Sequence, residues 1–286
     1  MTRSTILRNA VATAWLSLLI PAWAATNLPA CVYPSDMGLA VKLGNDLYQT
    51  LDARCQRNIN PAAFFTEQMD APEITPMENN DESNASCQVL ISTGFISLMN
   101  HVAHAKAIDR IQPGYFQQYA VALALECGGG SPSAAPNMVD ARYWSEDVMN
   151  DQAGLFNQMV GFTMAINLSH HYLGHYQKYA GQMSAGKLAP INDFITPSEW
   201  DASVKAAAIN SLDCALGTEG AIALFEVIDN MPRRPAWTGY IVPMNIGIKK
   251  LNTLLTRCET AYFHAGMKLN TSTVYWRVTP AKGAAN

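Results

Sequence analysis

The chain has 286 residues, of which 49% are hydrophobic and 15% charged, and its formal net charge is -4 at pH 7. No block of basic residues is present that could follow a phosphate backbone, so the sequence argues against a nucleic-acid partner. The length is sufficient for one large or two small domains with a hydrophobic core.

The N-terminus is typical of a secretory signal peptide. Arg3 and Arg8 precede an apolar segment over 10–20, and Ala22-Trp23-Ala24 has the small-x-small pattern of a cleavage site. We therefore expect residues 1–24 to be removed, which takes the formal charge from -4 to about -6 because two arginines are lost.

The mature chain, residues 25–286, is then expected to form a single exported domain, periplasmic or extracellular. A weaker alternative is a lipoprotein signal with anchoring at Cys31, although Pro29 is atypical at its position in such a signal. No later apolar run reaches about 18 residues, so no transmembrane helix is expected after the signal.

All six cysteines follow the predicted cleavage site, and an even number in an exported chain favours disulfide bonds. They are too far apart for a C-x-x-C zinc or redox site; the six are Cys31, Cys55, Cys87, Cys127, Cys214 and Cys258.

In the first half of the chain, apolar residues at four-residue intervals predict a helix over 35–58. The region 60–86 is rich in proline, asparagine and acidic residues, which predicts a loop with one edge strand over 63–68. A β-rich run predicts a strand over 88–93 that leads through Gly94 into a helix. A further helix over 115–127 is followed by a Gly/Ser/Pro loop to residue 136.

The second half is predicted to be helical. We expect a long central helix over 151–180, with Phe156, Met159, Phe162 and Met164 in the core. Thr196-Pro197-Ser198-Glu199 is a capping box that opens a helix running toward residue 228. A last helix over 243–258 and a strand over 273–278 complete a fold class that is mainly α with a small edge β-sheet.

The central helix carries three of the six histidines. His171 and His175 are four residues apart, which on a helix places both imidazoles on one face, where they can share one metal ion. This is the frame of the motif H-E-x-x-H, but Tyr172 stands at the position of the catalytic glutamate. A phenol with an ordinary pKa near 10 is a poor base at neutral pH, although it can donate a hydrogen bond to an oxyanion.

With its context, this motif resembles that of the gluzincin zinc metallopeptidases, in particular the family of the CAAX prenyl protease and its soluble periplasmic relatives. Three stretches carry the resemblance. The first is Asn84-Ala85-Ser86, which precedes a strand and the turn Thr93-Gly94-Phe95-Ile96. The second is His171-Tyr172-Leu173-Gly174-His175, which is similar to H-E-[IL]-G-H. The third is Val242-Pro243, which leads toward the last helix.

The resemblance implies a zincin-like fold and a zinc ion bound by His171 and His175. The third ligand implied is Glu219, with Asp213 as the alternative. It implies an exported metallopeptidase-like hydrolase acting on a protein or peptide, with hydrolysis impaired by Tyr172. The alternative hypothesis is a catalytically inactive binding or assembly factor of the cell envelope, that is, a pseudoenzyme on the same scaffold.

Structural interpretations compete with the metal site. His171 and His175 can simply be packed or hydrogen-bonded within a helical core, which would leave an exported helical protein without a metal. His170 is expected at the surface or as an outer partner of a ligand. His101 and His104, three residues apart on a predicted helix, are a weaker candidate for a second site.

Overall fold

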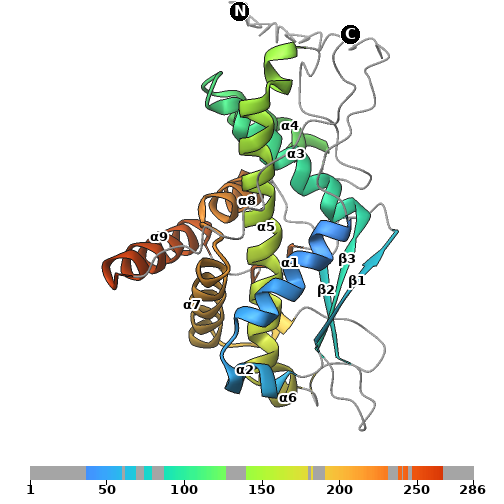
Figure 1. Cartoon of the computed structure of the whole chain (residues 1–286), viewed down its shortest axis with the longest axis vertical. Helices are drawn as coiled ribbons and strands as arrows, with labels where there is room; N and C mark the ends of the chain where they lie inside the picture. The colour runs from blue at the N-terminus through green and yellow to red at the C-terminus, as the bar shows by residue number, and fades with distance from the viewer. Residues whose placement is uncertain are drawn as a thin grey trace, which may run out of the picture. The chain divides into compact units, whose positions relative to one another are not determined.

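A computed structural model describes most of the region predicted to be the mature domain (Figure 1). The described residues are 37–59, 62–68, 74–78, 87–126, 140–179, 182, 191–230, 238–239, 241–243 and 247–266. Several sequence-based predictions lie outside them, namely the signal peptide over 1–24, Cys31, Cys127, the loop over 128–136 and the strand over 273–278.

The protein is mainly helical with a small sheet, which confirms the predicted fold class. The described residues form three strands in the order β1-β3-β2: β1 (Ala62–Glu67) is parallel to β3 (Cys87–Ser92), and β2 (Ile74–Glu78) is antiparallel to β3. The strand β2 lies in the region predicted as loop. It was missed because proline is depleted in strands, and Pro76 is tolerated here since β2 is an edge strand.

The predicted helix over 35–58 is two helices, α1 (Met37–Thr50) and α2 (Ala53–Asn58). The break occurs at Asp52, whose carboxylate accepts hydrogen bonds from the backbone N–H groups of Arg54 and Cys55, both at 2.8 Å. Aspartate is among the best N-cap residues, so the chain starts a new helix rather than continuing the first.

The helices α3 (Thr93–Asp109) and α4 (Tyr115–Glu126) agree with the predicted ones. At the start of α3 the Ser92 hydroxyl accepts a hydrogen bond from the backbone N–H of Phe95 at 3.0 Å, so strand β3 ends directly in a capped helix.

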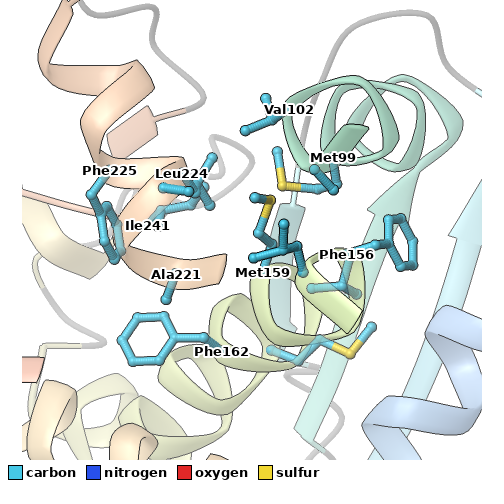
Figure 2. Packing of buried hydrophobic residues seen from close by; sticks show 14 of the residues in the cluster. Met99, Val102, Phe156, Met159, Phe162, Ala221, Leu224, Phe225 and Ile241 are labelled. Carbon is cyan, nitrogen blue, oxygen red and sulfur yellow. The ribbon is translucent and has the colours of Figure 1, made fainter. Parts of the chain in front are cut away.

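The core is organised around α5 (Glu146–Tyr172), which follows a short 3-10 helix, η1 (Ala141–Trp144), and contacts α1, α3, α7 and α8 (Figure 1). The residues predicted as its core face are all buried, as expected: Phe156, Met159, Phe162 and Met164. Figure 2 shows Met159 between Met99 of α3 and Leu224 of α8, and the rings of Phe162 and Phe225 meet edge to face at 5.7 Å.

The predicted helix from the capping box toward residue 228 is wrong in its length. The capping box is present, but α7 (Pro197–Asp213) ends before α8 (Glu219–Asn230) begins. Ala215 has a φ of 63°, and the backbone N–H of Leu216 donates to the Ser211 carbonyl at 2.8 Å, which is a Schellman turn. The Leu216 side chain then packs against Gly161, in the space that a Cβ on that glycine would fill. This contact favours the turn even though the residue with the positive φ, Ala215, is not a glycine.

The last helix, α9 (Ile248–His264), begins five residues after the predicted start and continues past the predicted end. No helix in the described part of the chain is long and apolar enough to cross a membrane. The four cysteines within the described ranges, Cys55, Cys87, Cys214 and Cys258, form no disulfide with one another. Disulfide bonding of the chain stays a prediction.

Candidate functional site

The central histidine segment contains a turn that the sequence did not predict. The helix α5 ends at Tyr172, and a separate short helix, α6 (His175–Tyr179), follows, so the predicted continuous helix over 151–180 is wrong. Gly174 has a φ of +77°, a conformation that costs glycine little and commonly ends helices. His175 therefore does not stand one helical turn above His171.

The turn instead brings His175 to His170. Their Nδ1 atoms are 3.0 Å apart, and the two rings are tilted by 46° with centroids 5.3 Å apart. His171 points elsewhere, since its ring stacks on Tyr176 at 4.3 Å. The structure thus pairs a histidine that was expected at the surface or as an outer partner with one of the two expected metal ligands.

A serine from α7 completes the contact. The Ser203 hydroxyl oxygen lies 3.1 Å from His170 Nδ1 and 3.4 Å from His175 Nδ1, and it also donates to the Glu199 backbone carbonyl at 3.1 Å. His170 and Ser203 are fully buried, and His175 is 5% exposed. We call His170, His175 and Ser203 the histidine cluster. Ser203 lies 33 residues after His170, and no spacing rule links the two.

Asn192, in the 3-10 helix η2 (Ile191–Asp193), has a side chain within hydrogen-bonding reach of His170. Its side-chain N–H donates to the Gly239 carbonyl at 2.8 Å, which turns its side-chain oxygen toward another donor. Burial lowers the pKa of His170 well below its usual range, as do His175 and His171, while a hydrogen bond with Asn192 opposes this shift. His170 is therefore neutral at pH 7.

The remaining histidine side chains of the segment are also held neutral. Burial lowers the pKa of His171 to about 3. Burial lowers the pKa of His175 as well, opposed by Glu199 and reinforced by Lys178. Neutral imidazoles can accept a hydrogen bond or bind a metal, whereas imidazolium can do neither.

Tyr172, at the position of the catalytic base, faces a different part of the molecule. Its backbone carbonyl accepts a hydrogen bond from Asn58 at 3.3 Å. Burial raises the pKa of its phenol, and the nearby Cys55 and Asp52 raise it further. The phenol is protonated at neutral pH and cannot act as a general base.

Neither candidate for the third ligand lies near the histidines. Glu219 is exposed and forms an ion pair with Arg110 at 3.0 Å, while its neighbour Gly220 packs on the backbone of Leu155. Sixteen residues of α5 separate Leu155 from His171, which is roughly 24 Å at 1.5 Å per residue.

Asp213 accepts a hydrogen bond from Tyr262 at 2.9 Å, and it follows Ser203 by about 15 Å along α7. The predicted set of His171, His175 and Glu219 or Asp213 does not come together, so these residues do not fit a zinc ion. Within the described ranges, no three His, Cys, Asp or Glu side chains are grouped to hold a metal.

The other histidine pair has a structural setting. His104 Nε2 lies 2.7 Å from the Tyr143 carbonyl, and its ring meets Trp144 edge on at 4.6 Å. Burial, reinforced by the nearby His104, lowers the pKa of His101 to about 4. These contacts join α3 to η1.

A link of charged residues holds α6 against α7 beside the histidine cluster. Glu199 contacts the Lys178 ammonium, accepts a hydrogen bond from the Tyr179 hydroxyl at 2.8 Å, and accepts one from the Thr196 backbone at 2.8 Å. Burial raises the pKa of Glu199, but these hydrogen bonds outweigh it and lower the pKa to about 2. The link supports α6 in the position that His175 needs to meet His170.

No protein family, no curated protein and no solved structure matches this chain.

Proposed function

We propose that this protein is an exported binding or assembly factor of the cell envelope, built on a scaffold that resembles the gluzincin peptidases and unable to hydrolyse peptide bonds. The observation that carries the proposal is the turn at Gly174, which directs His171 to Tyr176 and His175 to His170. A peptidase of this kind needs two histidines on one metal and a base beside the bound water. Neither requirement is met by the residues at the motif.

The small sheet supports a peptide or an extended protein segment as the client. The strands β1 and β2 are the two edges of the sheet, and β2 runs antiparallel to β3. An extended peptide can add to a sheet edge through backbone hydrogen bonds, which bind without selecting one sequence. Export, in turn, rests on the N-terminal pattern over 1–24.

The test uses one probe for both binding and cleavage. Fluorescently labelled casein, an unfolded protein, is incubated with the purified mature chain in the presence of Zn²⁺. We expect a saturable rise in fluorescence anisotropy and no new casein fragments. Metal-dependent fragments that disappear in His175→Ala would make the protein a hydrolase and overturn the proposal. Absence of both binding and cleavage would also overturn it.

The variant Tyr172→Glu separates this proposal from the alternative of an impaired hydrolase. It restores the carboxylate of the motif. We expect no cleavage, because a base alone cannot act where the two histidines do not share a metal. Cleavage gained by Tyr172→Glu and lost again in Tyr172→Glu with His171→Ala would favour the hydrolase. Tyr172→Gln is the matched control, since it makes a similar change in size without a carboxylate.

A further inference from the structure

The histidine cluster brings three electron-pair donors to one point, from three helices. The Nδ1 atoms of His170 on α5 and His175 on α6 are 3.0 Å apart, and the hydroxyl oxygen of Ser203 on α7 lies 3.1 and 3.4 Å from them. Three atoms at these separations form a nearly equilateral triangle. Two neutral imidazole nitrogens that face each other so closely need either a proton or a cation between them.

The protons of His170 can be assigned from its surroundings. Its Nε2 atom and the side-chain oxygen of Asn192 are both buried without a partner of good geometry, while a hydrogen bond between the two side chains raises the pKa of His170. A proton on Nε2 that is donated to Asn192 satisfies both atoms. The Nδ1 atom of His170 then carries a lone pair directed at His175 and Ser203.

This pattern is that of a metal-binding histidine. Such histidines donate the proton of the second ring nitrogen to an oxygen acceptor, which fixes the tautomer and orients the ring. The oxygen of Asn192 is placed to have that role for His170. Asn192 is itself oriented by its bond to the Gly239 carbonyl, so the acceptor is held before any metal arrives.

The distances are close to those that one metal ion requires. With metal–nitrogen bonds of about 2.0–2.1 Å and a tetrahedral angle, two nitrogen ligands stand about 3.3–3.4 Å apart. The observed 3.0 Å needs only a small outward movement of one ring, and the Ser203 oxygen is already at 3.1 and 3.4 Å. His175 belongs to a five-residue helix after a glycine turn, whereas His170 belongs to the 27-residue helix α5.

We propose that His170 and His175 bind one divalent transition metal of the zinc type through their Nδ1 atoms, with the Ser203 oxygen as a third, weaker donor and water in the remaining position. Imidazole ligands suit zinc, nickel and copper better than magnesium or calcium. The ion would cross-link α5, α6 and α7. This site does not depend on the proposed function, and its ligands differ from the pair indicated by the sequence motif.

The experiment compares three histidine variants of the tag-free mature protein, titrated with Zn²⁺ and with Co²⁺. We expect one ion per chain in the wild type and a concentration-dependent rise in the melting temperature, because a ligand of the folded state stabilises it. Binding is lost in His170→Ala and in His175→Ala. It is retained in His171→Ala, the matched control, since that ring stacks on Tyr176. Asn192→Ala should bind about 10–100-fold more weakly.

Two outcomes of the titration overturn the proposal. Loss of binding in His171→Ala and retention in His170→Ala would assign the metal to the motif pair instead. No uptake by the wild type would leave the cluster as a hydrogen-bonded histidine pair. A measurement on the wild type covers the case in which His170→Ala fails to fold. The imidazole nitrogen spectrum should show two histidines whose Nδ1 signals move on addition of Zn²⁺. Absence of any shift in the Nδ1 signals would also overturn the proposal.

Discussion

The middle and the C-terminal end of α5 belong to one helix but have opposite environments. Around Phe156, Met159 and Phe162 the helix is packed in apolar side chains of α3 and α8 (Figure 2). At His170 the same helix is equally buried but is in contact with hydrogen-bonding groups of α6, α7 and η2. Burial of the helix therefore contributes differently to stability at the two places.

The difference follows from what each kind of burial contributes. Apolar burial stabilises a fold at about 25 cal/mol per Å² and needs no particular partner. Buried imidazoles stabilise little and must find partners, because an unsatisfied buried polar group costs about 1–3 kcal/mol. The middle of α5 thus holds the fold together, and the end of α5 carries the polar side chains that can bind a ligand.

The largest expected effect is in the middle of α5. Phe162→Ala should lower the free energy of unfolding by about 3–5 kcal/mol, since it opens a cavity beside Phe225. Phe65→Ala on β1 is the matched control, because Phe65 is 44% exposed and its loss should cost about 0.5 kcal/mol or less. Urea unfolding measures both. Equal losses in the two variants would show that the middle of α5 is not the main source of stability.

The comparison is sharpened by a half-buried histidine on α3, the helix that packs against the middle of α5. Burial lowers the pKa of His101 on α3 from 6.5 to about 4, so the unfolded chain binds a proton that the folded chain excludes as the pH falls from 6.5 toward 4. Stability is therefore lost over this range, by up to about 1.4 kcal/mol per pH unit for one proton.

The variant His101→Asn should reduce that slope, whatever its effect on stability at pH 7. Urea unfolding of variant and wild type at several pH values between 4 and 8 gives the comparison. Above pH 7 the two slopes should coincide, because histidine is neutral in both states. Equal slopes between pH 4 and 6.5 would mean that His101 takes up its proton without unfolding.

The smallest expected effect is at the start of α7, beside the histidine cluster. Thr196 caps α7: its hydroxyl accepts a hydrogen bond from the Glu199 backbone at 3.3 Å, and its backbone N–H donates to the Glu199 carboxylate at 2.8 Å. Thr196→Ala should cost about 1 kcal/mol of unfolding free energy. Thermal unfolding would show it, with Ser198→Ala as the control in the same turn. An equal cost in Ser198→Ala would contradict a specific role for the cap.

Prediction from sequence succeeded where the controlling interaction is local. The capping box at 196–199, the strand before α3 and the buried face of α5 all follow from patterns within a few residues. It failed at the ends of helices. Gly174 and Ala215 both adopt positive φ angles, and both sit within segments whose apolar periodicity continues beyond them.

The candidate site likewise combines features that local sequence predicts with features that it does not. The sequence indicates the correct segment, but its spacing pairs His175 with His171 and not with His170, because that spacing holds only on a continuous helix. A glycine within a helix costs only about 1 kcal/mol, so local preference alone does not decide whether Gly174 continues the helix or ends it. Asn192 and Ser203 had no signal in the sequence at all.

By itself, the sequence determined the mainly helical class, most helices and the core face of α5, since these depend on periodicity and capping along a few turns of chain. Tertiary structure alone decided which histidines meet. His170, His175 and Ser203 come from three helices, and they converge because α6 is held against α7 through Lys178 and Glu199 after the turn at Gly174. Contacts between residues about 30 positions apart depend on packing, which no local pattern encodes.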